Sequence, residues 1–589
     1  MKEKNTTAII RKLYLELFPI QALSAGLPFI NSLLNSFLIG NLIGPTALAA
    51  IGFVSPLNNA LVAVSSTFAI GSQLLCGQYL GQGNRNGIRS AFSGTVVLSI
   101  LAGLLFTGTF LFFPGQLARI LGASPDTIIM TADYIRGMSF GMIFSILLSS
   151  LLPFLHLDQK GALSVVSILS MAAVNVIGNL LNALVFKGGM LGVGLSVSAA
   201  NICALLICLP HFCFRSKVFR FSFSAISGKV LGRVLYLGLP SAVTPACNIL
   251  RSRLFNYYIF TLGGTVAVSA FTVACNISDC IGCTLEGGFN DSSSLMSSVL
   301  VGERDSSSLR DLPRVMIRST YWLSIVAYAF FFLLAKPLVL LFGAEPASVS
   351  VYVMVLRLYC LWFLTSLYKT YSISLYRSVG KVTLVSLLYI WNSLVIPAIC
   401  CVLLSPAFGL PVIVGSPVLC ELGTILLCVI YFTVKAKRLP RGPGELAYLP
   451  SDLVSVPREN RFKATLRTVE EAAAVSQQAI DFCQNKGLSR KTAYYCGLCL
   501  EEMMMDTINN GFSKNKKKDY AIDLRLIYEN GDISILLRDN CPHFDPTEWL
   551  ALCAPEDPTR SVGIRMVSKL AKEMNYTSTL GLNVLTLKL

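Results

Sequence analysis

The chain has 589 residues, of which 54% are hydrophobic and only 14% are charged, and its mean hydropathy is +0.64. This composition excludes an ordinary soluble globular protein and is typical of a protein that crosses a membrane several times. The formal net charge of +16 would suit nucleic acid, but most of the excess lies in loops on one side of the expected membrane part, so we expect no nucleic-acid partner.

Apolar runs of roughly 20 residues, the length that a helix needs to cross a bilayer core, recur from Leu13 to Phe432. After Arg441 the chain becomes rich in Glu, Lys, Asp and Arg, as in a soluble protein. We therefore predict an all-α polytopic membrane part followed by a soluble domain. The twelve predicted spans cover residues 15–40, 49–73, 91–114, 129–155, 161–186, 191–214, 232–262, 266–290, 315–343, 350–373, 381–405 and 411–434.

The basic residues of the loops predict the orientation of these spans. They fall almost entirely on the side that also holds both termini, and the positive-inside rule makes this the cytoplasmic side. We therefore expect a multi-pass protein of the bacterial plasma membrane, with both termini and the soluble domain in the cytoplasm. The residues concerned include Lys2, Lys4, Arg11, Lys12, Arg85, Arg89, Lys160, Arg215, Arg310, Arg314, Lys435 and Lys437.

The membrane part repeats itself loosely. "GPTALAAIGF" from Gly44 recurs as "GGTVAVSAFT" from Gly263, and "LGQGNR" from Leu80 recurs at nearly the same offset as "LVGERD" from Leu300. Paired halves are typical of transporters that bind substrate between them, and a channel or an intramembrane enzyme explains the repeat less well. We predict two six-helix halves over residues 1–219 and 220–440, a linker over 441–454 and a further domain over 455–589.

Several motifs of the membrane part resemble those of the multidrug and toxic compound extrusion (MATE) family. They are "FLIGNLIGPTALAAIGF", "GQYLGQGNRNGIRSAF", "VNVIGNLLNALVFKGGMLGVGLSVSAAN" and "LGLPSAV", in this order among the spans. The resemblance covers about Leu13 to Lys437. It implies a secondary-active exporter of small amphiphilic compounds of the organic-cation type, driven by H⁺ or Na⁺ antiport across the lipid bilayer.

The resemblance places coupling residues of the first half at positions that carry amides in this chain. The family pattern has an Asp in the first span, where this chain has Asn35. In the fifth span it has an Asn and, four residues later, an Asp, where this chain has Asn175 and Asn179. Because amides form hydrogen bonds but do not titrate, we expect these side chains to line the transport cavity without carrying a coupling proton.

Carboxylates in the second half are the remaining candidates for ion coupling, because burial in a membrane makes their protonation switchable. Asp279 and Glu286 lie seven residues apart in the eighth span and so share one helix face. Glu421 lies in the twelfth span, and Arg251 in the seventh is a candidate partner. Two interpretations stay open: ion or substrate binding, or a buried arginine–carboxylate pair that only joins two helices.

The tail reads as an α+β domain, predicted to be a two-layer sandwich. "RFKATLRT" is strand-like, "EEAAAVSQQAIDFCQNKG" is a helix closed by Gly487, and the next helix begins after Ser489 and ends at Gly511. "DYAIDLRLIYENGDISILLRDN" is a hairpin with an Asn-Gly turn. "SVGIRMVSKLAKEM" predicts a helix, and "NYTSTLGLNVLTLKL" predicts two short strands.

The order of motifs in the tail resembles that of GHKL ATPases, nearest the anti-sigma-factor serine kinases, over about Lys463 to Leu589. A glutamate on the second helix is followed by "DNCPHFDP", a glycine at the start of a helix, and "LGLN". The resemblance implies ATP and Mg²⁺ as cofactors. The residues that it places at the nucleotide are Glu502 as general base, Asp506 as magnesium ligand, Asp539 at the adenine amine, and Asn510, Phe544 and Gly563.

Two departures from the family pattern bear on catalysis in the tail. Asp506 stands where the family has Asn, so a further negative charge lies beside the expected phosphates, and Cys541 stands where it has a glycine. We expect nucleotide binding. A degenerate domain that only docks on a cytoplasmic protein partner is the alternative.

The leading interpretation is a multidrug exporter with a fused cytoplasmic nucleotide-binding regulatory domain. The competing one is a membrane-anchored sensor or serine kinase whose transporter-like part no longer transports, which the amides at Asn35 and Asn179 favour. Transport powered directly by ATP is not expected, because the chain has no G-x-x-x-x-G-K-[ST] phosphate loop. An uptake carrier would differ only in the direction of flux.

Overall fold

The computed structural model describes residues 6–123, 125, 127–216, 218–303, 305–341, 348–449, 457–512, 520–529, 531–553, 562–579 and 581–589. Long helices occupy the chain as far as Ala436, and a domain built on a five-stranded sheet follows. We call the helices before residue 220 the N-lobe, those from residue 228 the C-lobe, and residues 457–589 the tail.

The helices of the N-lobe begin and end close to the predicted spans. Asn84 caps one of them, since its side chain accepts a hydrogen bond from the backbone of Gly87. The bounds are α1 (Thr6–Leu42), α2 (Pro45–Gly81), α3 (Arg85–Phe112), α4 (Pro114–Ile120), α5 (Ile128–Ser139), α6 (Met142–Leu157), α7 (Gly161–Leu181) and α8 (Gly189–Pro210).

The C-lobe has one very long helical element and several broken ones. Its bounds are α9 (Gly228–Gly302), α10 (Ser306–Leu333), α11 (Ala335–Leu341), α12 (Val349–Tyr359), α13 (Ser366–Ser378), α14 (Val382–Ile390), α15 (Ile396–Ile399), α16 (Ser405–Phe408), α17 (Leu410–Val414) and α18 (Ser416–Ala436).

The element α9 consists of two helices that meet at Gly264, where φ is 62° and ψ is −160°. The ring centroids of Phe255 and Phe271 are 5.6 Å apart. Sixteen residues of straight helix would separate them by about 24 Å, so the chain folds back at Gly264. Only glycine adopts these dihedral angles without strain.

The described helices confirm a membrane part with many spans. Nine of them are long and apolar enough to cross a membrane, or eleven when each of two bent pairs counts as one span. The first pair is α5 and α6, bent by 57°. The second joins residues Val349–Leu364 to Ser366–Ser378 with a bend of 45°.

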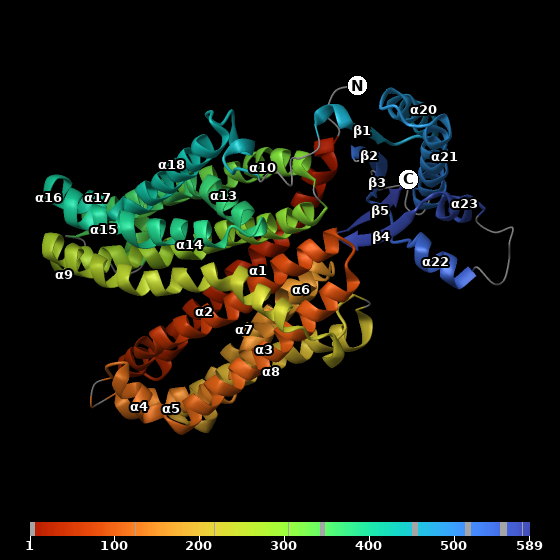
Figure 1. The fold of residues 1–589 in the computed structure, drawn as a ribbon. Coiled ribbons are helices and arrows are strands. Elements are labelled where there is room, and N and C mark those ends of the chain that lie inside the picture. The colour runs from red at the N-terminus through yellow and green to blue at the C-terminus, as the bar shows by residue number, and fades with distance from the viewer. Residues whose placement is uncertain are drawn as a thin grey trace.

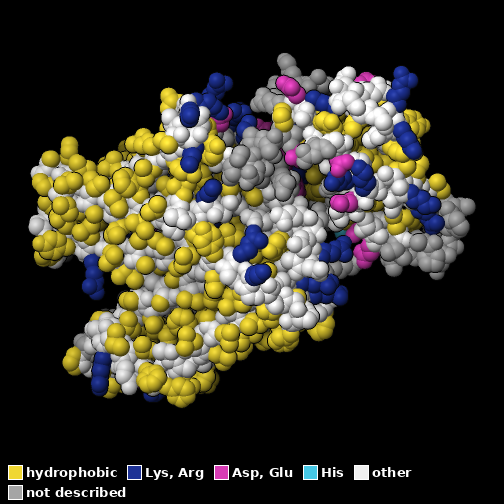
Figure 2. Space-filling view, viewed as in Figure 1, with side chains coloured by type: hydrophobic (Ala, Val, Ile, Leu, Met, Phe, Trp, Pro, Cys, Tyr) yellow, Lys and Arg dark blue, Asp and Glu magenta, His cyan; other side chains and the backbone are white. Residues whose placement is uncertain are grey.

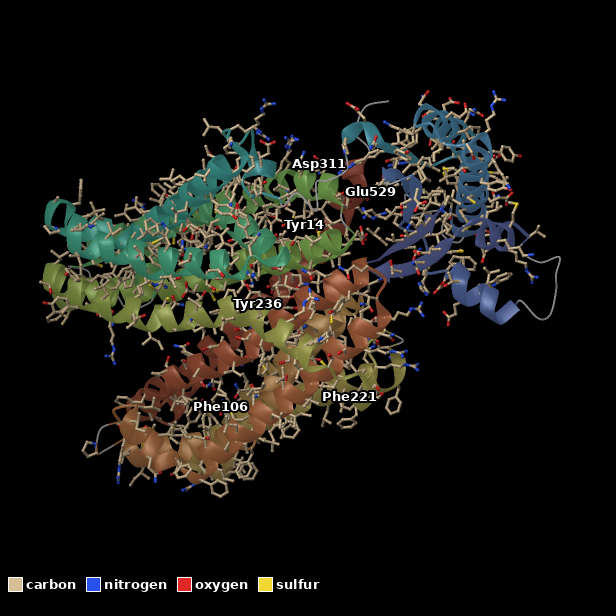
Figure 3. All side chains as sticks on the ribbon, viewed as in Figure 1. Tyr14, Phe106, Phe221, Tyr236, Asp311 and Glu529 are labelled. Atoms are coloured by element: carbon tan, nitrogen blue, oxygen red, sulfur yellow. The ribbon has the colours of Figure 1, made fainter. Side chains whose placement is uncertain are left out.

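The two lobes meet toward the tail and diverge away from it. Figure 1 shows α2–α8 in the lower lobe, α9–α18 in the upper lobe, and the tail beside the end at which the lobes join. Figure 2 shows hydrophobic side chains over both lobes, a notch between them at the diverging end, and most Lys and Arg toward the tail. In Figure 3, Phe106 lies in the N-lobe, whereas Asp311 and Glu529 lie where the C-lobe meets the tail.

The tail is a mixed α/β domain with an antiparallel sheet in the order β1-β2-β3-β5-β4. Two helix caps and the hairpin occur where the sequence predicts them: Ser489 accepts from the backbone of Thr492, and Gly487 and Gly531 have φ of 77° and 87°. The bounds are β1 (Arg461–Leu466), α20 (Val469–Asn485), α21 (Arg490–Asp506), β2 (Ile522–Glu529), β3 (Asp532–Asp539), α22 (Pro546–Cys553), α23 (Val562–Leu570), β4 (Glu573–Thr579) and β5 (Leu582–Lys588).

One boundary in the tail differs from the prediction, and one short helix was not predicted. The last helix ends at Leu570, because Glu573 and Met574 pair with β5 in the sheet instead of continuing α23. The segment after "DNCPHFDP" forms the short helix α22, whose first turn Asp545 caps by accepting from the backbone of Thr547 and Glu548.

The two faces of the sheet have different neighbours, as the period of two along a strand requires. Leu524 and Leu526 of β2, with Ile535 of β3, pack into the hydrophobic core that the helices α20, α21 and α23 cover. Arg525 and Arg538 alternate with these residues and point to the opposite face. That face lies against the loop between α9 and α10 of the C-lobe.

Candidate functional site

The three predicted amides of the N-lobe lie together between α1 and α7. The Asn179 side-chain amide donates to the side-chain oxygens of Asn35 and, at 3.1 Å, of Asn175. Asn175 and Asn179 are buried, and the side-chain oxygen of Asn179 has no hydrogen-bond partner among the described residues. The N-lobe therefore holds a buried polar site that accepts hydrogen bonds but carries no titrating group.

In the C-lobe, Glu286 of α9 and Glu421 of α18 meet at Lys369, which was not among the predicted site residues. Lys369 of α13 donates from Nζ to Oε1 of each glutamate, at 2.9 Å in both cases. The hydroxyl of Thr370 also donates to Glu286 Oε1, at 2.8 Å. A lysine inside a predicted apolar span was the available signal, since charged groups at membrane depth are rare and functional.

Asp279 does not join this cluster, and the predicted arginine–carboxylate pair is not formed. No hydrogen bond or ion pair connects Asp279 to Arg251 or to any other residue that the structure describes. Glu286 and Glu421 are paired with a lysine instead of an arginine. Asp279 thus remains a half-buried carboxylate on the helix face that also carries Glu286.

In the tail, Glu502 of α21 lies against Gly563 of α23. A Cβ atom at Gly563 would overlap the Oε2 atom of Glu502, so only glycine allows this approach of backbone and carboxylate. Because Gly563 lies in the first turn of α23, the predicted general base is close to a helix N-terminus, whose backbone N–H groups favour anions.

Asp539, at the end of β3, is held by contacts from two other segments. Its Oδ1 atom accepts from the side-chain amide of Asn583 at 2.8 Å and from the backbone of Cys541 at 2.9 Å. Burial raises the pKa of Asp539, although both hydrogen bonds oppose the shift. Asn583 in turn accepts from the hydroxyl of Tyr576 at 2.7 Å. Asn583 was missed because the motif "LGLN" indicated a hairpin without indicating where its side chain lies.

The remaining predicted nucleotide residues make contacts of their own. The Asn510 side chain donates to Asp506 Oδ1 at 2.8 Å, and burial raises the pKa of Asp506. Phe544 is partly exposed and stands 6.4 Å from the ring of Trp549. Cys541 has no positive φ, so the glycine that it replaces is not required by the backbone here. Burial raises the pKa of its thiol.

These residues fit Mg²⁺ with a nucleotide. Mg²⁺ is usually held by one or two carboxylates together with phosphate oxygens, and Asp506 and the amide oxygen of Asn510 are hard oxygen ligands of this kind. The described residues contain no cluster of three or more His, Cys, Asp or Glu that would hold a metal ion without phosphate. The close approach at Gly563 brings the Glu502 carboxylate to the first turn of α23.

A buried ionic network joins the tail to the C-lobe. Arg525 of β2 pairs with Asp305 and donates to Asp523 at 2.8 Å, while Arg538 of β3 pairs with Glu303. All five side chains are at most 6% exposed. Burial opposes ionisation of Asp305, but the two arginines outweigh it and hold its pKa well below the usual range. Arg525 also donates to Ser308 at 2.9 Å.

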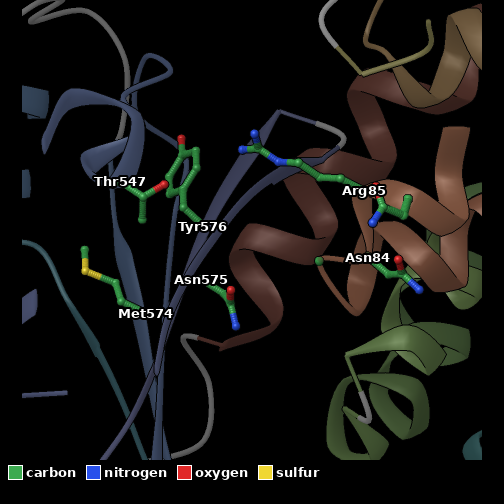
Figure 4. Close-up of a pocket in the computed structure, with 8 residues that line it drawn as sticks. Asn84, Arg85, Thr547, Met574, Asn575 and Tyr576 are labelled. Carbon is green, nitrogen blue, oxygen red and sulfur yellow. The ribbon is translucent and has the colours of Figure 1, made fainter. Parts of the chain in front are cut away.

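The tail contacts the N-lobe through a more exposed pair. Arg85, 72% exposed, lies 3.2 Å from the carboxylate of Asp545, which is 5% exposed. A cavity of about 380 Å³ lies between the two parts beside this pair. Figure 4 shows the residues that line it. Its lining comes from both sides: Gly83, Asn84, Arg85 and Asn86 of the N-lobe, and Thr547, Met574, Asn575 and Tyr576 of the tail.

The chain has two helical lobes, each with a buried polar site, followed by a mixed α/β domain whose residues fit a nucleotide. This combination defines a membrane transporter with a fused ATPase-like domain. Comparison with protein families agrees. The MatE family model matches residues 23–220 and 240–403, and the model of the histidine kinase-like ATPase domain matches residues 462–589. The chain belongs to the MATE family and carries a C-terminal GHKL-type ATPase domain.

Individual relatives are distant. The multidrug export protein MepA of Staphylococcus aureus (strain MSSA476) is 24% identical over 217 residues, which are 36% of this chain and 48% of MepA. MepA of Staphylococcus saprophyticus is 23% identical over the same length. The chain thus spans about half the length of the curated relatives it matches.

Solved structures share the fold of the membrane part. A MATE crystallised in complex with MaL6 has a TM-score of 0.68 at 17% identity, with 73% of this chain and 96% of that chain covered. A MOP superfamily transporter from Pyrococcus furiosus, for which a binding pocket of reverse polarity is described, has a TM-score of 0.66 at 18% identity, with 71% and 95% covered.

Proposed function

We propose that this protein is a secondary-active exporter of small amphiphilic, organic-cation-type compounds, driven by H⁺ or Na⁺ antiport and regulated by its nucleotide-binding tail. The observation that carries the proposal is the pair of MATE lobes, each with a buried polar site, that diverge on one side and meet on the other (Figure 1). Transport between two halves needs such an arrangement. The MepA relatives are named as multidrug export proteins, which supports the same direction of flux.

The proposed topology has twelve spans. The fold-back at Gly264 divides α9 into two spans, and each of the two bent pairs supplies one more to the nine helices that qualify singly. The tail contacts the loop before α3 and the loop before α10, which the basic residues assign to the cytoplasmic side. We therefore propose a bacterial plasma-membrane protein with both termini in the cytoplasm.

The tail is proposed to bind ATP with Mg²⁺. Asp539 would accept from the adenine amine, Asp506 and Asn510 would hold Mg²⁺, and the first turn of α23 at Gly563 would face the phosphates. Bound ATP would supply a transferable phosphoryl group. Glu502 would then orient the attacking hydroxyl as general base, either that of water or that of a serine in a cytoplasmic protein partner.

Regulation of transport is supported by where the tail touches the lobes. Glu303 and Asp305 lie in the segment "LVGERD", and Arg85 ends the repeat-related segment "LGQGNR". The tail therefore bridges equivalent loops of the two lobes at the end where they meet. Opening the cavity at this end requires the loops to separate, so a tail that holds both stabilises the state open at the opposite end. Nucleotide binding would act on that equilibrium.

Export is tested by drug-dependent growth and dye efflux in a bacterium that lacks its own multidrug exporters. Expression of the protein should protect against cationic amphiphilic drugs and accelerate efflux of a cationic dye. Asp279→Asn should abolish both if this carboxylate takes part in coupling, since an amide cannot carry a proton. Ser222→Ala, a change at a partly exposed residue outside both polar sites, serves as the matched control. Full export by Asp279→Asn would remove Asp279 from the coupling site.

The second candidate function is a membrane-anchored sensor or serine kinase. The observation that favours it is the pair of hydrogen-bonded amides Asn35 and Asn179 in the N-lobe, at the two positions where the family pattern has aspartates. A protein of this kind would leave growth in drug unchanged while its tail still binds ATP. Unchanged growth in drug together with ATP binding by the tail would contradict the exporter and support the sensor or kinase.

A further inference from the structure

Three charged side chains from three different helices meet inside the C-lobe. The ammonium nitrogen of Lys369 lies 2.9 Å from a carboxylate oxygen of Glu286 and 2.9 Å from one of Glu421. The lysine and Glu421 are 13% and 7% exposed, and Glu286 is 28% exposed. The cluster is therefore enclosed by the bundle and reached from the side of Glu286.

The contacts leave the cluster with more carboxylates than cations. Lys369 uses two of its three N–H groups on the glutamates, and Thr370 gives a further hydrogen bond to the oxygen of Glu286 that Lys369 already holds. When both carboxylates are ionised, the two carboxylates and the one ammonium group give the cluster one net negative charge.

Two carboxylates this close together inside a membrane repel each other unless a cation lies between them. A free monovalent cation bound by oxygen ligands would satisfy this need, and in this chain the position between the two Oε1 atoms is filled by Lys369. A second cation there would lie within bonding distance of the ammonium group and would be repelled by it.

We propose that Lys369 is a tethered cation that fills the place of Na⁺ between Glu286 and Glu421, so that this site excludes Na⁺. The inference rests on the proposed antiport. Of the two candidate coupling ions, H⁺ and Na⁺, it excludes Na⁺ at this site. Removing the charge of Lys369 should create a sodium site where the native chain has none.

The test measures binding of ²²Na⁺ to the purified full-length protein in detergent. The native protein should show no binding that Glu286→Gln or Glu421→Gln removes. Lys369→Gln should gain saturable binding of one ion per chain, and the double variant Lys369→Gln/Glu286→Gln should lose it again. Lys369→Arg keeps the charge and should bind no Na⁺. Lys381→Gln, a change at an exposed lysine of the same lobe, should match the native protein.

Either of two results overturns the proposal: native binding of ²²Na⁺ that depends on Glu286, or a monodisperse Lys369→Gln protein that gains none. If Lys369→Gln does not fold, ²²Na⁺ binding by the native protein and by Glu286→Gln still tests whether the native site excludes Na⁺. The assay contains no drug, so its outcome is separate from that of the export assay. Na⁺ binding at Glu286 in a proven exporter would overturn the tethered cation and leave the exporter standing.

Discussion

Single residues decide the chemistry of the tail, and Asp539 shows how. The sequence places this aspartate at the end of a strand before "NCPHFDP", where the resemblance to GHKL ATPases predicts contact with the adenine amine. Its orientation depends on Asn583 and the backbone of Cys541, which come from other parts of the chain. A motif predicts which residue acts, but the partners that hold it are fixed by the packing of distant segments.

Asp539→Ala should weaken ATP binding by about tenfold to a hundredfold, because a hydrogen bond to a charged group contributes about 1.5–3 kcal/mol. Calorimetry of the full-length protein with Mg²⁺–ATP measures the change. Asp532→Ala is the matched control, since Asp532 lies at the other end of the same strand and pairs with the exposed Lys572. Equal affinities of the native protein and Asp539→Ala would contradict the assigned role.

The raised pKa of Asp539 gives this binding a pH dependence with a definite sign. The ionised carboxylate is the stronger acceptor for the adenine amine, so affinity is highest above the raised pKa and falls as the pH drops through it. For an ordinary exposed aspartate the midpoint of this loss would lie near pH 4. Calorimetry at decreasing pH should therefore show a loss whose midpoint lies above about pH 4 and which is absent from Asp539→Asn.

At the scale of elements, the hydropathy pattern predicts most helices correctly, whereas their breaks need the structure. Gly264 lies between the predicted spans 232–262 and 266–290, and the chain does fold back there. The bends between α5 and α6 and after Leu364 lie inside single predicted spans. Hydropathy averages over a window and carries no information on dihedral angles, so it locates a span but not the bend within it.

Gly264→Ala should destabilise the protein by about 1–3 kcal/mol, because φ of 62° with ψ of −160° is open essentially to glycine alone. No atom lies near the position of the added Cβ, so the cost is one of backbone conformation and not of steric overlap. Thermal unfolding of the purified protein measures it.

The control for this substitution is Gly232→Ala, at a helical position in α9 that also has open space around the added Cβ. It should leave the unfolding temperature unchanged or raise it, because alanine favours a helix interior over glycine. Equal unfolding temperatures for the two variants would contradict a required positive φ at Gly264.

At the scale of the whole molecule, the tail bridges the two lobes, and its two attachments differ in strength. Arg538 is buried with Glu303, whereas Arg85 is mostly exposed beside Asp545. Removing one partner of a buried pair leaves an unpaired buried charge and costs about 3–5 kcal/mol. An exposed pair contributes about 0–1 kcal/mol.

Arg538→Ala should therefore release the tail from the C-lobe, while Arg85→Ala should leave it docked. Hydrogen–deuterium exchange measures the difference: exchange of the loop between α9 and α10 and of β2 should accelerate in Arg538→Ala alone. Faster export by Arg538→Ala would further support a tail that restrains the lobes. Equal protection of these segments in both variants would show that the buried network does not hold the tail.

The sequence by itself determined the class of the protein: the apolar runs, the internal repeat, the MATE motifs and the α/β tail all follow from patterns that are local in the chain. It also placed Asn35, Asn175 and Asn179 in one group, and the structure brings them into contact. Such predictions succeed because periodicity and motif spacing are properties of neighbouring residues.

Only the tertiary structure decided which charges neutralise one another. Two sets of ion pairs join elements that are far apart in the sequence. Lys369 pairs with Glu286 and Glu421, and Arg538 pairs with Glu303. Asp279 stays outside the first cluster although it shares a helix face with Glu286. An ion pair in a low-dielectric interior forms where packing brings two side chains within a few ångströms, and neither composition nor spacing encodes that distance.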